Sequence, residues 1–416
     1  MKKGWLLGLT VLLGACSQNE PEILEQEKEP VTLEFFTVKE ETRPIFDQLI
    51  ANFEEKYPHI NIEQVIAPNG MSVLKTRIAQ GYPPDLFISY PLEQDYRNRA
   101  LKGYMLDLTK EMFLDRVQPT IQQRYEVNGH MYGVAFTQNA VGVLYNKDDF
   151  CDLGLTIPST WDEWIAVMNA LKKSGKQPLI MPNKDANQTS IVTLSFVANA
   201  FLPSYWQMPS SVQDDDPRWK EITQKVKTLI SYTTPESFNM GYSEANEAFA
   251  AKEGTMYIMG SWALPIIEKL NPTLQYGIFP VPVSNDPEQN NVLGGVDIGI
   301  SISSETKYPA EAKLFLSFLT EENNAQGLSL YEGSISTIMG VQKTKEVLEP
   351  LEEKVTDGET VNWPNHYWAG GTAAETEYRQ HTMQFFLDQN ERKYLHNLEE
   401  MFEKYNKNMT SEKVNP

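Results

Sequence analysis

The sequence predicts an α/β protein with two lobes, and three observations support this fold class. Short apolar runs typical of buried parallel strands alternate with stretches of helical periodicity over residues 31–89. The chain has 416 residues, which is more than one hydrophobic core usually serves, so two cores are expected. It has only two cysteines, so stability is expected to come from packed cores and not from a disulfide framework.

The first predicted elements follow a β-α-β-α-β order. A strand at residues 31–37 precedes a helix that begins at Pro44, a strand at 60–66, a helix that ends at Gly81 and a strand at 85–89. This order is typical of a doubly wound parallel sheet. Ligands of such sheets bind beyond the carboxyl ends of the strands. The side chains nominated in this way are Thr37, Lys39, Glu40, Ser89 and Tyr90.

The middle of the chain adds a hairpin, further strands and capped helices. Asn128 and Gly129 predict a hairpin turn, and a strand is expected at 140–146. Thr160 and Glu163 form the capping-box pattern at the start of a helix. Further helices are expected at Pro217, near Ser243, near Trp262 and at Pro309, and further strands at 255–259, 276–281 and 297–303. The chain after residue 341 is expected to be mostly helical.

The first 30 residues are expected to form a targeting segment. Two lysines precede an apolar stretch that is too short to span a bilayer and is typical of a signal peptide. The motif LGAC at residues 13–16 resembles the lipobox of bacterial lipoproteins, which implies removal of residues 1–15 and lipid attachment to Cys16. The alternative is an ordinary signal peptide in which Cys16 has no role. Residues 16–30 are acidic and are expected to serve as the lipid anchor and a flexible tether.

The charge balance is strongly acidic. The chain has 36 basic and 56 acidic side chains, a formal net charge of −20. Such a surface repels nucleic acid and anionic lipid, so neither is an expected partner. A neutral or cationic target is expected instead.

The catalytic signatures that sequence patterns can show are missing. The chain has no G-x-S-x-G elbow, no phosphate-binding G-x-x-x-x-G-K-[ST] loop and no H-E-x-x-H pair. Its five histidines are scattered, so no metal site, no cofactor and no catalytic residue is expected. The run DDDP at 214–217 lacks the glycine and distal glutamate of a calcium loop, and Asp216 is expected to cap the helix that begins at Pro217. A carboxylate pair suited to glycoside hydrolysis stays open, because only its separation in space would reveal it.

Trp262 is the side chain that most suggests a ligand. It follows the strand at 255–259, and Gly260 is expected to let the backbone turn there. An indole placed in a cleft suits the apolar face of a sugar ring, while neighbouring amides and carboxylates suit its hydroxyls. The alternative is a core tryptophan packed under the following helix. These two interpretations stay open at this point.

Five motifs together resemble the extracellular solute-binding proteins of ABC sugar importers, the maltose-binding-protein-like family, and its multiple-sugar-binding lipoproteins. The motifs are PPDLFISY…ALKGYMLDLT at 83–109, NGHMYGVAFTQNAVGVLYNKDDF at 128–150, LGLTIPSTWDEW at 153–164, AFAAKEGTMYIMGSWA at 248–263 and GGVDIGISISSETKYPAEAKLFLSFLT at 294–320. Each motif is weak alone, but their order and spacing are specific. The resemblance covers nearly the whole chain after the signal peptide.

The resemblance implies a type II periplasmic-binding-protein-like fold with discontinuous lobes and a ligand cleft between them. An N-terminal lobe is expected at 31–139 plus 297–340, and a C-terminal lobe at 140–296 plus 341–416. Carried over by position, the ligand-binding residues are Thr37, Glu40, Ser89, Tyr90, Gln138, Asn139, Trp262, Gly295, Asp297 and, as the C-terminal aromatic, Trp368 or Trp363. Ser89 and Tyr90 stand where the maltose binder has a tryptophan, which argues against a maltodextrin preference.

The function that follows from the resemblance is binding without chemistry. The chain is expected to be a monomeric lipoprotein on the extracellular face of the cell membrane, held by lipid on Cys16. It is expected to deliver a sugar or short oligosaccharide, such as an α-galactoside or α-glucoside, to the permease subunits of an ABC transporter. Two alternatives are a binding protein for a polyamine, which the acidic charge allows, and a secreted carbohydrate-active enzyme.

Overall fold

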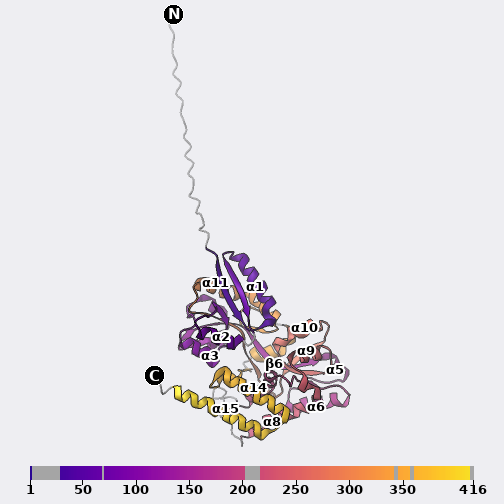
Figure 1. Ribbon diagram of the computed structural model, residues 1–416. Coiled ribbons are helices and arrows are strands. Elements are labelled where there is room, and N and C mark those ends of the chain that lie inside the picture. Colours follow the sequence, from indigo (N-terminus) through magenta and orange to yellow (C-terminus); the bar gives the residue numbers. More distant parts are fainter. Residues whose placement is uncertain (2–28, 68–69, 202–215, 342–344, 357–359, 413–416) are drawn as a thin grey trace.

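The computed structural model describes residue 1 and residues 29–67, 70–201, 216–341, 345–356 and 360–412 (Figure 1). The predicted signal peptide, the lipidation residue Cys16 and most of the predicted tether lie outside the described residues. Within the part of the chain that the structure describes, no helix is both long enough and apolar enough to cross a membrane.

The first elements are those that the sequence predicts. They are β1 (Val31–Thr37), α1 (Arg43–Lys56), β2 (Ile60–Ile66), α2 (Gly70–Ala79) and β3 (Leu86–Ile88). β1 lies between β2 and β3 and pairs with both in parallel. The predicted doubly wound start is therefore confirmed, and the carboxyl ends of β1 and β3 lie at the same edge of the sheet.

Two long strands continue this sheet. β6 (Val134–Asn146) and β10 (Val292–Ile302) pair antiparallel, and β10 also pairs antiparallel with β3. Beyond residue 140, β6 pairs instead with β8 (Met256–Gly260) and β9 (Tyr276–Pro280). The main strand order is β2-β1-β3-β10-β6-β8-β7, where β7 is Leu179–Ile180. Both strands start earlier than predicted, since β6 begins at residue 134 and β10 at residue 292.

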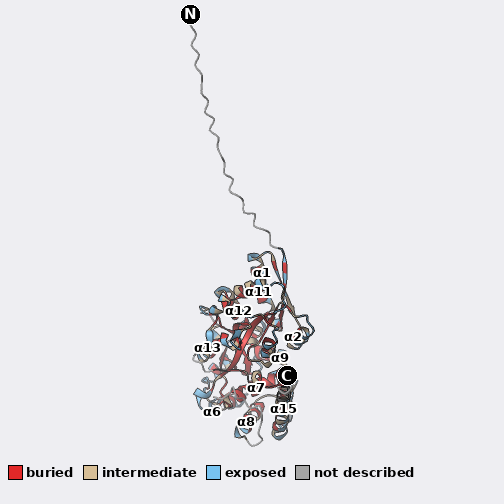
Figure 2. Cartoon of the chain, turned by 90° about the vertical axis from the view of Figure 1, so that its left-hand side faces the viewer, coloured by how far each residue is buried: buried red, intermediate tan, exposed pale blue. Residues whose placement is uncertain are grey.

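The buried apolar side chains form two separate cores. The first core takes residues from 31–136 and from 296–338, and the second takes residues from 140–293, Ile335 and residues from 348–402. β6 contributes Phe136 to the first core and Val141 to the second. Figure 1 shows β6 at the junction of the two groups of helices, and Figure 2 shows the buried strands inside an exposed outer layer.

Helices cover the sheet on both sides of this junction. Near the first core lie α3 (Gln94–Leu101), α4 (Pro119–Gln122), the hairpin strands β4 (Glu126–Val127) and β5 (His130–Met131), α11 (Pro309–Leu319) and α12 (Glu322–Glu332). Near the second core lie α5 (Lys147–Asp152), α6 (Trp161–Lys173), α7 (Ala186–Ala200), α8 (Pro217–Ile230), α9 (Tyr242–Ala250), α10 (Leu264–Leu270), α13 (Glu349–Thr356), α14 (Gly371–Asp388) and α15 (Glu391–Glu412). The short strands β11 (Ile335–Ser336) and β12 (Thr360–Val361) pair with β6 and β10.

The two helix caps and the hairpin turn that the sequence predicts are confirmed. The Thr160 hydroxyl accepts from the Glu163 backbone N–H at 3.3 Å, and the Glu163 carboxylate accepts from the Thr160 N–H at 3.2 Å, which completes the capping box. Asp216 caps α8 by accepting from the Arg218 N–H at 2.9 Å. Asn128 and Gly129 both have positive φ in the turn between β4 and β5.

Candidate functional site

A cavity of about 580 Å³ lies where the two cores meet. Residues that follow β1 and β3 line one side, and residues of α7, the β8–α10 junction and α14 line the other. Because both cores contribute to its wall, a molecule inside the cavity contacts both. A volume of this size is typical of a small-molecule site.

Four of the ten residues in the predicted ligand-binding set line this cavity. They are Tyr90, Asn139, Trp262 and Asp297. The structure therefore brings together residues from β6 and β10, from the segment after β3 and from the segment after β8.

The other predicted residues lie elsewhere. Thr37, Ser89 and Gln138 are buried behind the cavity wall, and Ser89 accepts a hydrogen bond from the Ser301 hydroxyl at 2.7 Å. Glu40 is exposed and pairs with Arg43 at 3.1 Å. Lys39, which the strand-end argument nominated, lines the cavity, and so does Glu41.

Of the two tryptophans considered as the C-terminal aromatic, Trp363 lines the cavity and Trp368 does not. Trp368 is 2% exposed and packs in the second core against Tyr378 and Phe402, with ring centroids 4.7 and 5.1 Å away. The predicted position of Trp368 in the cleft is therefore replaced by Trp363. The two residues lie on opposite ends of a 3₁₀ turn at 364–367, so their side chains point to different surroundings.

Trp262 and Trp363 form an aromatic corner in the cavity wall. Their ring centroids lie 6.2 Å apart at an interplanar angle of 44°. The Trp363 Nε1–H donates to Asn139 Oδ1 at 3.3 Å, and the Gly295 backbone N–H donates to the same oxygen at 3.0 Å. Two indole faces beside a fixed amide offer an apolar surface with a polar edge, which suits one ring of a carbohydrate.

Gly260 makes room for this corner. A Cβ atom at residue 260 would lie 2.0 Å from the Trp262 ring, which no side chain tolerates. Its φ of −84° is ordinary extended backbone, so the turning role expected for this glycine is wrong. The residue is small because the indole packs directly over its backbone.

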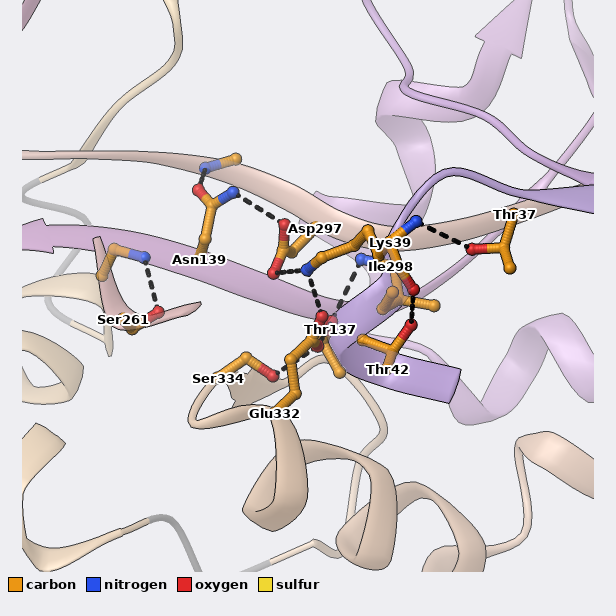
Figure 3. A network of polar contacts seen from close by, with 12 residues as sticks. Thr37, Lys39, Thr42, Thr137, Asn139, Ser261, Asp297, Ile298, Glu332 and Ser334 are labelled. Atoms are coloured by element: carbon orange, nitrogen blue, oxygen red, sulfur yellow. Dashed lines mark hydrogen bonds and ion pairs between the residues drawn. The ribbon is translucent and has the colours of Figure 1, made fainter. Parts of the chain in front are cut away.

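A paired ionic cluster, called here the Lys39 network, lies beside the corner (Figure 3). Its members are Lys39, Thr137, Asn139, Asp297, Glu332 and Ser334. The Lys39 ammonium contacts Asp297 Oδ2 at 2.6 Å and also pairs with Glu332. Asp297 Oδ1 accepts from the Asn139 amide at 3.1 Å, and Glu332 Oε2 accepts from the hydroxyls of Thr137 at 2.7 Å and Ser334 at 2.9 Å. Every oxygen of both carboxylates therefore has a donor.

The charges of this network depend on one another. Burial opposes the charge on Lys39, but the carboxylates of Asp297 and Glu332 outweigh it and raise the pKa of Lys39 well above its ordinary value. Burial and the nearby Asp297 carboxylate raise the pKa of Glu332 to about 7, although Lys39 acts against this shift. Lys39 thus stays charged and fixes the orientation of Asp297, a cavity residue.

A second polar group, called here the charged wall, lines another part of the cavity. Its members are Glu93, Asn365, His366, Glu375 and Arg379. Arg379 pairs with Glu375 one turn earlier on α14. Burial, together with the Glu375 carboxylate, raises the pKa of Glu93 to about 8. Burial and the cations of Arg124 and Arg379 lower the pKa of His366 to about 3, so this ring is neutral at pH 7.

One direct contact joins the two sides at the cavity rim. The Thr372 hydroxyl, at the start of α14, donates to Asp95 Oδ2 at 2.8 Å, and Asp95 Oδ1 accepts from Lys75 at 2.9 Å. Asp95 lies in the first turn of α3, which packs on the first core through Tyr96, whereas α14 packs on the second core. The hydrogen bond between Thr372 and Asp95 therefore forms only when the two cores lie at this distance from one another.

Among the described residues, no three His, Cys, Asp or Glu side chains form a group that could hold a metal ion. Of the two cysteines, Cys151 lies within the described chain and is exposed with a free thiol. The arrangement described so far offers stacking surfaces, hydrogen-bond donors and acceptors from two sides of one cavity. These are the means of binding a polar molecule.

The model of the bacterial extracellular solute-binding protein family matches residues 39–326, more than half of the chain. The chain belongs to this family. Its α/β fold is also that of solved solute-binding proteins.

Three relatives are named for the sugars that they bind. The multiple sugar-binding protein of Streptococcus mutans is 29% identical over 374 residues, 87% of this chain and 88% of the relative. The melibiose/raffinose/stachyose-binding protein MelE of Bacillus subtilis is 21% identical over 355 residues, 79% of each chain. The structure of RafE from Streptococcus pneumoniae in complex with raffinose matches with a TM-score of 0.82 and 29% identity, covering 89% of this chain and 98% of RafE.

Proposed function

We propose that this protein captures a neutral sugar or short oligosaccharide, such as an α-galactoside, and presents it to the permease of an ABC transporter. The observation that supports this most is the aromatic corner of Trp262 and Trp363 beside Asn139 and Asp297, in a cavity lined from both cores. The ligands for which the relatives are named, raffinose and melibiose among them, belong to the same chemical class.

The proposed mechanism is closure around the ligand. One stacked ring and several hydrogen bonds suffice for a micromolar dissociation constant, which corresponds to about −8 kcal/mol. The ligand favours closure only if it binds the closed form better than the open form, so contacts from both cores are required. Tyr90 packs against the first core and Trp262 against the second, and both line the cavity.

Several parts of the proposal come from the sequence. They are the N-terminal lobe at 31–139 plus 297–340, the C-terminal lobe at 140–296 plus 341–416, lipidation of Cys16, the extracellular membrane location, the monomeric state and the absence of catalytic turnover. The division of the hydrophobic residues into two cores supports the lobe boundaries. Replacing Cys16 with serine should release the protein from the membrane into the medium, and its retention would contradict the anchor.

The ligand class can be tested by calorimetry with product analysis. Purified protein is titrated with raffinose, melibiose, isomaltose, maltotriose and the polyamine spermidine. Binding of at least one neutral sugar without any product is the expected result. Binding of spermidine alone would make the protein a polyamine binder, and release of monosaccharides would make it an enzyme.

The aromatic corner can be tested by substitution. Trp262→Ala and Trp363→Ala should each weaken sugar binding by at least about tenfold, because a lost stacking surface costs more than 1 kcal/mol. Tyr82→Ala is the matched control, since Tyr82 is an aromatic residue that is 71% exposed and does not line the cavity. Unchanged affinity in both tryptophan variants would remove the corner from the site.

A further inference from the structure

The pairing of β10 with β6 is irregular at Asp297. Val296 and Ile298 pair with consecutive residues of β6, so Asp297, between them, is an extra residue of β10. The register is restored at Gly299. Asp297 therefore occupies a β-bulge in one of the two strands that run between the cores.

The bulge explains why the Asp297 side chain reaches the cavity. Successive residues of a regular strand point to opposite faces of the sheet, yet Val296 and Asp297 are successive and both line the cavity. Bulges of this kind re-aim a side chain beside a functional site. The Asp297 side chain is 7% exposed. Each of its oxygens keeps a second lone pair for a ligand hydroxyl, besides the one used by Lys39 or Asn139.

Thr137 contacts the bulge from behind. It is fully buried and does not line the cavity. Its hydroxyl oxygen accepts from the backbone N–H of Ile298, the residue directly after Asp297, at 3.1 Å (Figure 3). The same hydroxyl donates to Glu332 Oε2 at 2.7 Å. One hydroxyl therefore holds both the backbone of the bulge and a carboxylate of the Lys39 network.

These two hydrogen bonds reach Asp297 by two routes. The first route is the peptide group that joins Asp297 to Ile298. The second runs from Glu332 to the Lys39 ammonium, which contacts Asp297 Oδ2 at 2.6 Å. A valine in place of Thr137 would have nearly the same shape but would provide neither hydrogen bond, so the bulge and Glu332 would both lose a buried partner.

We infer that Thr137 is a positioning residue for the ligand, because it holds the bulge of β10 and Glu332 in the arrangement that turns the Asp297 carboxylate toward the cavity. Thr137 does not touch the ligand and acts through Asp297. This inference rests on the proposed function. It adds a residue outside the cavity wall that sets the affinity for sugar.

A double-mutant cycle tests this role. Raffinose, or whichever neutral sugar named above binds most tightly, is titrated into the wild type, Thr137→Val, Asp297→Asn and the double variant. Thr137→Val should weaken binding about tenfold in the wild-type background and less than about twofold in the Asp297→Asn background. Equal losses in the two backgrounds, which a residue that only stabilises the fold would give, would overturn the inference.

A conservative variant and a matched control separate positioning from folding. Thr137→Ser keeps the hydroxyl and should bind within about twofold of the wild type. Thr320 is also fully buried, and its hydroxyl donates to the Ser317 carbonyl at 2.8 Å and accepts from Arg116 at 3.0 Å, away from the cavity lining. Thr320→Val should therefore lower the unfolding midpoint about as much as Thr137→Val but leave the affinity unchanged. A matching loss of affinity in Thr320→Val would contradict the role of Thr137. Thr137→Cys, whose thiol is a weak donor and acceptor, replaces Thr137→Val if that variant fails to fold.

Crystal structures of the variants without ligand distinguish this inference from the proposed function. In Thr137→Val the Asp297 carboxylate should move away from Lys39 and Asn139, and in Thr137→Ser it should stay. An unmoved carboxylate in Thr137→Val would overturn the positioning role even if the protein binds sugar. Failure of the wild type to bind any neutral sugar would overturn the proposed function, and the structures would still decide whether Thr137 positions Asp297.

Discussion

Two polar regions face the same cavity and are built in opposite ways. In the Lys39 network, one buried cation holds two carboxylates, and every carboxylate oxygen has a donor. On the charged wall, Glu93, Asn365 and Arg379 each keep an unpartnered atom. The first arrangement stabilises and orients the folded chain, whereas the second leaves buried polar atoms unsatisfied, which lowers stability.

This difference predicts which changes affect folding and which affect binding. Removing a member of the Lys39 network leaves buried charges without compensation. Removing the side-chain amide of Asn365 from the charged wall takes away an unsatisfied polar atom and no charge, and so spares the fold. Three experiments follow. The first two measure unfolding, and the third measures unfolding and binding together.

The largest expected effect is that of Lys39→Met. The variant leaves Asp297 and Glu332 buried as adjacent carboxylates, which should lower the free energy of unfolding by about 3–5 kcal/mol. Chemical denaturation followed by circular dichroism measures it. Arg43→Ala is the control, because its pair with Glu40 is exposed and should be worth less than about 1 kcal/mol. Similar losses in both variants would show that the network does not stabilise the fold.

The next effect is a pH dependence that comes from Glu93. Burial and Glu375 raise its pKa to about 8, against the opposing effect of Arg99 and Arg379 and with a further contribution from Asp95. The folded chain therefore keeps a proton that the unfolded chain releases above the ordinary glutamate pKa. This contribution to stability is complete below about pH 4.5 and is lost as the pH rises to about 8.

Glu93→Gln mimics the protonated form and should flatten this loss. The free energy of unfolding should fall with pH less steeply in the variant, by up to about 1.4 kcal/mol per pH unit. Melting curves of both proteins between about pH 5 and pH 8 measure the difference. Parallel curves would mean that Glu93 ionises normally in the folded protein.

The smallest expected effect is that of Thr372→Val at the cavity rim. Loss of the hydrogen bond to Asp95 should weaken raffinose binding about fivefold, or about 1 kcal/mol, because the contact joins the two sides of the cavity. The unfolding midpoint should hardly change. Thr228→Val removes an exposed hydroxyl bond within α8 and should affect neither quantity. A variant that loses stability but not affinity would assign Thr372 to the fold.

Sequence periodicity predicted the first sheet well because its signals are local. Apolar runs, the helix start at Pro44 and the capping box at Thr160 depend on neighbours within a few residues. The first halves of β6 and β10 were missed because Gln138 and Asn139 interrupt the apolar pattern of one strand, and Gly294 and Gly295 that of the other. These residues are tolerated in strands because the cavity and the neighbouring backbone lie beside them.

The strand pattern alone predicted site residues only where they follow a strand, whereas Asn139 and Asp297, which lie within β6 and β10, came from the family resemblance. The expectation that ligands bind beyond the carboxyl ends of parallel strands led to Lys39 and Tyr90. It extends to Glu93, which lies four residues after Ser89. No local pattern points to Glu375 or Arg379, because the packing of α14 against α7 and α3 brings them to the cavity. The choice between Trp363 and Trp368 likewise required the direction of each side chain, which spacing does not reveal.

The strands β6 and β10 each contribute residues to both cores, and this has a consequence for biosynthesis. The sheet of the first core is complete only when β10, at residues 292–302, has entered between β3 and β6. Until the ribosome has made that segment, the newly made amino-terminal third presents two open strand edges, which are prone to aggregation. Contacts so distant in sequence also make folding slow. The amino-terminal third therefore has to be kept from misassembly until residues 292–302 have emerged.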